Sequence, residues 1–362
     1  MRNYTFDKIK ACACILIILI HCKFPAVIGD LFEALARFGV PMFFAIAGIY
    51  LTKEKHPDAY SIRKSAGRKL FKTIGITLKI WTIYTAYSFI YAMTVGYGAS
   101  AWFHEKFNLF EFSRLILFNS GKFIYDFTYA FDHMWYLFAL IYVYGLIYIF
   151  APMMEKAAKP ISVILLAFLF LGEGLQIYYP IRPFGINISV WYTIRNWLFI
   201  GIPFTLLGFW INNEKAELKV KQPLTLGTML VIIGIFSTLM EYKKWGQIEV
   251  YFGSLLIVIG LIIVGCYRSD KDKGQISEND KTFIEKCLSY IGRELSSGIY
   301  FYHVLIISFV GWCIDRTVPG LYGNAFFMYM RPVIVITITI LISFLLYKVK
   351  FITIKSNNNL RK

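Results

Sequence analysis

Long apolar stretches constrain this chain more than any other feature of its sequence. Ten stretches of about 16 to 23 mostly apolar residues follow one another, and a helix needs roughly 20 such residues to cross a bilayer. We therefore predict an all-α integral membrane protein, a bundle of about ten transmembrane helices. The predicted spans lie near residues 10–28, 37–52, 73–95, 133–151, 161–179, 195–212, 223–240, 250–267, 297–314 and 331–349.

Two of these spans contain a proline. Pro41 lies inside the short second span, and Pro203 lies inside the sixth. Because proline removes a backbone hydrogen bond from a helix, we expect Pro203 to kink the sixth span.

The composition agrees with a lipid environment. Hydrophobic residues make up 57% of the chain and charged residues only 17%, whereas about 25% of an average soluble protein is charged. The net charge of +16 comes from basic residues that stand between apolar stretches. They form no single patch, so we expect no nucleic-acid partner. The cysteines show neither metal-ligand nor disulfide spacing, so we expect no metal and no bound cofactor.

The distribution of lysine and arginine predicts the orientation. With the N-terminus in the cytoplasm, 26 of the 38 basic residues fall in cytoplasmic segments, as the positive-inside rule requires. We therefore predict that both termini are cytoplasmic and that the protein is a multi-pass protein of the plasma (inner) membrane.

We predict a single transmembrane domain over residues 1–352 and a short basic cytoplasmic tail over residues 353–362. Two connections are long. The outer loop, about 96–132, is rich in aromatic residues, and the inner loop, about 268–295, begins with a polar segment. In the outer loop, Phe112, Leu115 and Ile116 recur at helical spacing and predict a helix at the membrane surface.

The first span carries an aligned pair of ionisable residues. Lys10 and His21 are eleven residues apart, which puts them about 20° apart around a helix and about 16 Å apart along it. His21 would then lie near the bilayer midplane or beyond it. An imidazole titrates near neutral pH in water and is suited to general-base catalysis. The alternative is that His21 only bonds to a neighbouring helix.

A basic cluster precedes the third span. Arg68 and Lys72 share a helical face, and Lys69 with Lys72 is an alternative pair. Such a cluster either forms a cationic mouth for a phosphorylated cytoplasmic ligand or anchors the helix at the membrane surface.

Further polar residues lie at or near membrane depth. Each could be structural, but together they predict a polar cavity in the outer half of the bundle. They are Arg37, His133, Trp135, Glu173, Arg195 and His303.

Five segments resemble the membrane acyltransferases of family 3. In FDKIKACACILIILIHC (6–22), a basic residue, ten residues and a histidine follow one another as in the family's first helix. RFGVPMFFAIAGIYL (37–51) resembles the second helix, although Ala47 replaces the family's serine. HMWYLFALIY (133–142), RNWLFIGIPFTLLG (195–208) and SYIGRELSSGIYFYH (289–303) resemble later family segments in the same order.

The resemblance implies an O-acyltransferase. It implies transfer of an acyl group, usually acetyl, from cytoplasmic acyl-CoA to a hydroxyl of an extracytoplasmic or lipid-linked glycan. It also implies that His21 is catalytic and that Lys10, with Arg68 or Lys72, binds the acyl-CoA co-substrate. The six polar residues named above would then shape the acceptor side.

Two other functions compete with this one. Polar groups at the midplane also occur in transporters of small polar solutes, although we find no inverted repeat. A structural partner in a glycan assembly complex would use the same residues only to bind helices together.

Overall fold

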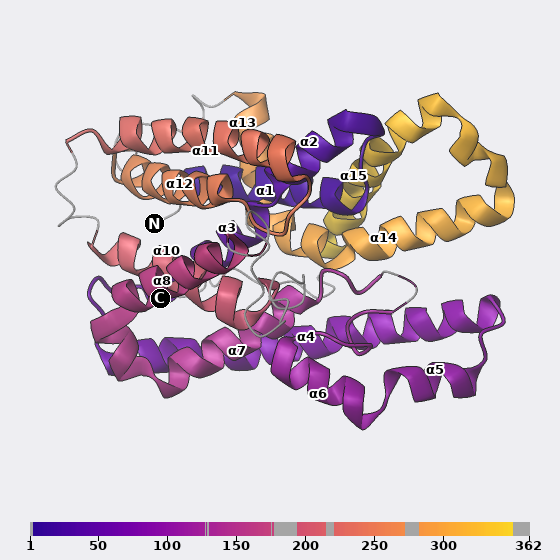
Figure 1. The fold of residues 1–362 in the computed structure, drawn as a ribbon, viewed down its shortest axis with the longest axis horizontal. Helices are drawn as coiled ribbons and strands as arrows, with labels where there is room; N and C mark the ends of the chain where they lie inside the picture. Colours follow the sequence, from indigo (N-terminus) through magenta and orange to yellow (C-terminus); the bar gives the residue numbers. More distant parts are fainter. Residues whose placement is uncertain are drawn as a thin grey trace.

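The computed structural model describes residues 3–126, 128, 130–174, 176, 194–214, 221–271 and 282–349. Within these residues every regular element is a helix (Figure 1), which confirms the all-α prediction. The predicted tail, residues 353–362, lies outside them. The α-helices are α1 Tyr4–His21, α2 Ala26–Ala36, α3 Gly39–Ile49, α4 Ala59–Thr94, α5 Ala99–Lys106, α6 Leu109–Phe118, α7 Trp135–Ile149, α8 Ala151–Glu173, α10 Ile202–Glu214, α11 Pro223–Trp245, α12 Phe252–Lys271, α13 Phe283–Tyr290, α14 Ser296–Thr317 and α15 Ala325–Lys348.

Four segments within the described residues are long and apolar enough to cross a membrane. They are Ala26–Ile49, Pro223–Trp245, Phe283–Thr317 and Ala325–Lys348. The pair α7 and α8, bent by 116°, makes a fifth if it is counted as one span. These helices support a membrane protein, while the number of ten spans and the cytoplasmic termini remain predictions.

The first predicted span, 10–28, ends earlier than we expected. α1 stops at His21, and α2 begins only at Ala26. Pro25 explains the break, because a proline disfavours helical backbone at the residue before it and has no N–H to donate. His21 is therefore the last residue of a helix and does not lie in the middle of one.

The two prolines that we expected inside spans lie near the starts of helices. Pro41 is in the first turn of α3, where its missing N–H breaks no hydrogen bond. The break before α3 therefore precedes the proline. Pro203 is the second residue of α10, and α10 directly follows a π-helical turn, Trp197–Gly201. The helix is therefore distorted close to the position where we expected a kink.

Helices extend into both ends of the inner loop that we predicted over about 268–295. α12 continues to Lys271, and helix resumes at Phe283. A capping box starts the second helix, because the Thr282 side chain accepts from the Glu285 backbone while the Glu285 side chain accepts from the Thr282 backbone. From there α13, a π-helical turn (Ile291–Leu295) and α14 form one continuous helical segment.

The helix predicted in the outer loop is present as α6. The Asn108 side chain caps its first turn by accepting from the Glu111 N–H. Leu115 is buried, while Phe110, Phe112 and Ile116 are exposed. The exposed apolar side chains agree with a helix that lies against lipid.

The helices pack around α1, which contacts α2, α3, α12, α13, α14 and α15. Figure 1 shows α11 and α12 side by side at one edge and α4, α5 and α6 toward the opposite edge. α14 and α15 pair beside α1.

Two glycines bring α3 and α10 into backbone contact. A Cβ atom added at Gly48 would lie 1.8 Å from the carbonyl oxygen of Thr205, and one at Gly208 would lie 2.0 Å from that of Ala45. Small residues allow this close approach between helices in a membrane. The contact fixes α3, which follows Arg37, against α10, which follows Arg195.

We expect Gly208→Ala to destabilise the fold by about 1–3 kcal/mol, because the added methyl group must push α10 away from α3. Gly145→Ala on α7 is the control, since nothing lies within 4 Å of its added Cβ. Thermal unfolding of both variants in detergent, followed by size-exclusion chromatography, measures the difference. Equal midpoints for the two variants would contradict the close packing.

Candidate active site

A central chamber of about 50 Å³ contains His21. Its wall combines the end of α1, the start of α3, the start of α7, a residue of α14 and the connections before the π-helical turn and before α12. The charged and titratable side chains on this wall, apart from two tyrosines, are His21, Arg37, Asp132, His133, Arg195 and Glu249. The structure therefore brings together four of the predicted residues, His21, Arg37, His133 and Arg195, from four separate segments.

A second cavity, of about 230 Å³, adjoins the chamber. Because it contains Lys72, which the sequence predicts to bind the donor, we refer to it as the donor cavity. Lys69 and Lys72 of α4 line it together with Thr73 and apolar side chains. Tyr136 and Tyr300 line both this cavity and the central chamber. The two spaces are therefore neighbours that meet at these two tyrosines.

A third cavity, of about 490 Å³, is also lined by His21. We refer to it as the acceptor cavity, after the outer side on which the sequence predicts the acceptor. His21 and Asp132 line both this cavity and the chamber. Trp312, Asp315 and Arg331 add an aromatic ring and charges of both signs. His21 thus stands at the junction of the chamber and the acceptor cavity.

The donor and acceptor cavities lie at opposite ends of the bundle. On α4, Lys72 lines the first and Tyr91 the second. The 19 residues between these positions correspond to about 29 Å of helix, close to the roughly 30 Å thickness of the hydrocarbon core. α14 shows the same order, with Ser297 in the donor cavity and Asp315 in the acceptor cavity.

Three histidine rings cluster at the chamber. The ring centroid of His303 lies 5.3 Å from that of His21 and 5.0 Å from that of His133. The Nδ1 atom of His303 lies 3.0 Å from the Ile299 carbonyl oxygen and 2.9 Å from that of Tyr300. Since carbonyl oxygens only accept, we assign the proton to Nδ1, which leaves Nε2 as an acceptor. Among the described residues, no group of His, Cys, Asp or Glu side chains is arranged to hold a metal ion.

Glu249 joins the two arginines of the chamber. Its carboxylate accepts from Arg195 at 2.6 and 3.0 Å and from Arg37 at 3.0 Å. Arg37 also donates to Glu33 at 2.6 Å, and Glu33 pairs with Lys23. Two guanidinium groups from distant segments are thus held beside His21 by one carboxylate.

Our sequence analysis did not single out Glu249. It lies in the short connection between α11 and α12. The only sequence signal is one acidic residue between two apolar spans, and such a residue is usually a solvated loop residue. Its partners, Arg37 and Arg195, are 212 and 54 residues away, so the pairing becomes visible only in the fold.

The predicted donor residues separate in the structure. Lys72 lines the donor cavity, and its neighbour there is Lys69, whose ammonium lies 5.9 Å from the ring centroid of Tyr144. Arg68 is exposed and donates to the Ser65 hydroxyl at 3.3 Å. Of the two pairs left open by the sequence, the cavity therefore contains Lys69 with Lys72.

The remaining predicted residues take different places. Lys10 forms an ion pair with Asp7 at 2.9 Å and lines none of the three cavities. Trp135 lines the chamber. Glu173 is buried at the end of α8 and, like His303, lines none of the three cavities.

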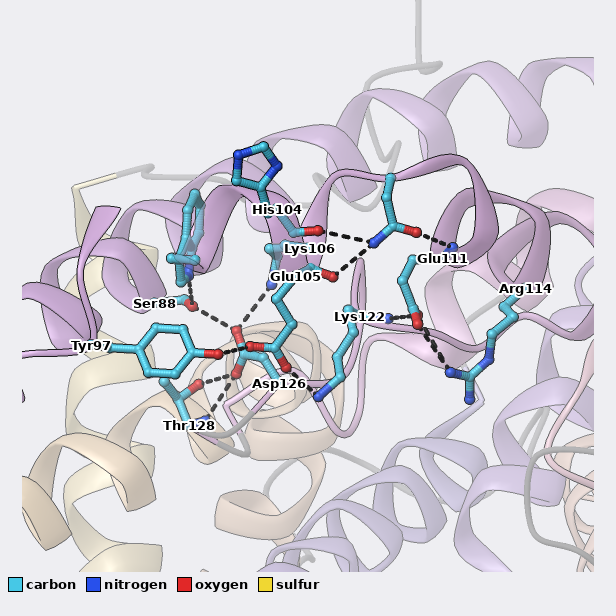
Figure 2. A network of polar contacts seen from close by, with 12 residues as sticks. Ser88, Tyr97, His104, Glu105, Lys106, Glu111, Arg114, Lys122, Asp126 and Thr128 are labelled. Atoms are coloured by element: carbon cyan, nitrogen blue, oxygen red, sulfur yellow. Dashed lines mark hydrogen bonds and ion pairs between the residues drawn. The ribbon is translucent and has the colours of Figure 1, made fainter. Parts of the chain in front are cut away.

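The outer loop is tied to α4 by a buried carboxylate. Figure 2 shows Asp126 accepting from the Ser88 hydroxyl at 2.6 Å and from the Lys106 ammonium at 2.9 Å. The indole of Trp102 donates to the same Ser88 hydroxyl at 2.9 Å. Both charged partners are almost fully buried, so the pair fixes α5 against α4.

A second set of contacts fixes the segment that leads to α7. The Glu111 carboxylate accepts from the Lys122 backbone at 2.6 Å and from Arg114 at 3.2 Å (Figure 2). The Asn119 amide donates to the Trp135 carbonyl oxygen at 2.7 Å. Because Asp132 and His133 lie just before Trp135, these contacts hold one wall of the chamber in place.

We expect Glu249→Gln to lower stability by about 3 kcal/mol, because it removes the carboxylate shared by two partly buried guanidinium groups and breaks the ion pair with Arg195, while Arg37 keeps Glu33. Thermal unfolding in detergent measures the loss. Glu285→Gln is the matched control, since it removes the more exposed pair with Lys8 and should shift the midpoint less. A Glu249 variant as stable as the control would show that the three charges do not hold the chamber together.

Comparison with known proteins places the chain in a family. The model of an acyltransferase domain, that of family 3, matches residues 3–348. No curated protein and no solved structure matches the chain. Since the matched region covers nearly the whole sequence and includes all three cavities, this protein belongs to acyltransferase family 3.

Proposed function

We propose that this protein is an acyl-CoA-dependent O-acyltransferase of the plasma membrane. It would move an acyl group, specifically acetyl, from cytoplasmic acyl-CoA to a hydroxyl of an extracytoplasmic or lipid-linked glycan. The observation that carries the proposal is the series of cavities that meets at His21. A histidine at such a junction has access to two substrates that arrive from opposite ends of the bundle.

The donor cavity suits acyl-CoA. The ammonium groups of Lys69 and Lys72 supply positive charge for the CoA phosphates. Beyond them, Leu137, Leu140 and Phe301 provide apolar contact for the pantetheine arm. The positive-inside rule puts this end of α4 in the cytoplasm, where acyl-CoA is found. Lys10 and Arg68 are predicted to lie toward the same side and would add to its positive charge.

The acceptor cavity suits a polar, hydroxyl-rich molecule. Trp312 and Tyr322 contribute aromatic rings to its wall, and Asp315 and Arg331 contribute charges that can form hydrogen bonds. Aromatic faces pack against the apolar face of a sugar ring, while carboxylates accept hydrogen bonds from its hydroxyls. This combination supports a glycan acceptor.

The proposed reaction depends on the position of His21 between the two substrates. The imidazole takes the proton of the acceptor hydroxyl while the hydroxyl oxygen attacks the thioester carbonyl carbon. The C–S bond breaks as the C–O ester bond forms, and the thiolate of CoA receives the proton. Arg37 and Arg195 provide positive charge in the same chamber for the developing oxyanion. In the alternative route, His21 first carries the acyl group on its ring nitrogen and then passes it to the hydroxyl.

We expect His21→Ala to reduce acyl transfer by about 10²–10⁴-fold, the usual contribution of a general base. Membranes containing the protein receive acetyl-CoA labelled in the acetyl group, and label is followed in the lipid-linked and glycan fractions together with free CoA. His104→Ala is the control, because His104 lies on α5 in the outer loop. Uptake of a solute without CoA release would instead support a transporter, and equal transfer by all three proteins would exclude the catalytic role of His21.

We expect the KM for acetyl-CoA to rise as the pH rises through about 8. Lys69 precedes the predicted third span, and burial, with Lys72 and Arg68 nearby, lowers the pKa of its ammonium to about 8. Because the folded pKa is below the usual lysine value, the cation is present below pH 8 and lost above it. Lys69→Arg should flatten the KM profile, since guanidinium stays charged.

A comparison of two neutral variants decides between the alternative basic pairs. Lys69→Ala should raise the KM for acetyl-CoA more than Arg68→Ala does, because only Lys69 lines the cavity. A larger effect of Arg68→Ala would contradict our assignment of the donor cavity.

A further inference from the structure

Two tyrosines form the boundary between the donor cavity and the central chamber. Tyr136 of α7 and Tyr300 of α14 line both spaces. Their ring centroids are 5.2 Å apart, and the rings meet edge to face at 66°. A group that moves from the donor cavity to His21 must therefore pass these two rings.

The position of Tyr300 is fixed by hydrogen bonds at both ends of the residue. Its hydroxyl donates to the carbonyl oxygen of His133, and its own carbonyl oxygen accepts from Nδ1 of His303 at 2.9 Å. Its ring also packs against the His133 ring, with the centroids 5.1 Å apart. The side of the boundary formed by α14 is thus held by the residues around His21.

Tyr136 is held by ring packing. Its ring lies edge to face against Phe44 of α3, with the ring centroids 4.6 Å apart. It also lies edge to face against Phe43, with the centroids 6.4 Å apart. Its side chain is only partly buried, because both cavities border it. Tyr136 is therefore the part of the boundary whose removal would enlarge the opening with the least loss of hydrogen bonding.

The space beyond this boundary is small. The chamber measures about 50 Å³, against about 230 Å³ for the donor cavity. Since one water needs about 10–15 Å³ on the same scale, the chamber has room for only a few non-hydrogen atoms. An acetyl group has three. The thioester enters with its acyl end first, so every further methylene must fit into the chamber or extend into the acceptor cavity.

We propose that Tyr136 and Tyr300, together with the chamber they border, restrict the donor to acyl groups of two or three carbons. This inference rests on the proposed function, since it assumes that acyl-CoA occupies the donor cavity. A longer chain that crosses the boundary would reach past His21 and occupy the space of the acceptor hydroxyl. The two tyrosines are thus specificity-determining residues for the donor.

The experiment compares kcat/KM for acetyl-, propionyl-, butyryl- and hexanoyl-CoA in the full-length protein reconstituted in membranes. In the wild type we expect butyryl transfer at least about 10-fold below acetyl transfer, the lower end of the discrimination known for one misfit methylene. Tyr136→Ala should raise the butyryl-to-acetyl ratio by about 10-fold or more. Tyr136→Phe keeps the ring and should keep the wild-type ratio.

Leu140→Ala distinguishes an effect of the tyrosine boundary from an effect of the size of the donor cavity. Leu140 lines the donor cavity and not the chamber, so its truncation should leave the butyryl-to-acetyl ratio unchanged. If Tyr136→Ala does not fold, Tyr136→Leu serves in its place. The inference is overturned if the wild type uses hexanoyl-CoA as well as acetyl-CoA, or if Leu140→Ala broadens the profile as much as the Tyr136 variant.

A measurement of acyl-CoA binding distinguishes failure of the tyrosine boundary from failure of the proposed function. Thermal stabilisation of the wild-type protein by acetyl-CoA and by hexanoyl-CoA is measured without acceptor. If neither compound stabilises the protein and no label is transferred, the proposed function fails. If binding and transfer occur with no preference for short chains, only the role of the tyrosine boundary fails.

Discussion

The carboxylate of Glu249, placed between Arg37 and Arg195, is the interaction on which the rest of the site depends. A charge within a bundle surrounded by lipid is costly unless it is paired and hydrogen-bonded. Here one carboxylate pairs with two guanidinium groups that come from the start of α3 and from the segment before the π-helical turn. The pairing therefore draws three distant parts of the chain together. It also holds two guanidinium groups beside His21, where the proposed reaction would develop negative charge.

The position of His21 at the end of α1 puts its ring at the border of two cavities, as the proposed reaction of two substrates requires. A histidine in the middle of a packed helix is enclosed by neighbouring turns and adjacent helices. Because the helix is interrupted between Cys22 and Pro25, the ring of His21 borders both the chamber and the acceptor cavity. The opposite wall, Asp132 and His133, is held by the Asp126 and Glu111 contacts of the outer loop. Two independent structural elements therefore meet at His21.

Under the proposed function, the three cavities divide the selection of substrates between different parts of the protein. The donor cavity is lined by cationic and apolar side chains, the acceptor cavity by aromatic and charged ones, and the chamber between them is the smallest of the three. Recognition of each substrate can then depend on its own cavity, while the chamber limits which groups reach His21. Close packing of α3 against α10 through Gly48 and Gly208 helps to keep the chamber small, because α3 carries part of its wall and α10 continues directly from the π-helical turn that carries Ile200.

The sequence by itself determined the helical class, the membrane environment and the family, because apolar length and the spacing of motif residues are local properties of single segments. The catalytic role of His21 is a prediction that rests on the same local spacing, that of Lys10 and His21. It also located Arg37, His133, Trp135 and Arg195, which the structure brings into one chamber. Only the tertiary structure decided that Glu249 joins two arginines, that Lys69 and not Arg68 lines the donor cavity, and that Tyr136 faces Tyr300. Glu249 is 54 residues from Arg195 and 212 residues from Arg37 in the sequence. The two tyrosines are 164 residues apart. Such contacts depend on how helices rotate and pack against one another, and the periodicity of a single helix does not contain that information.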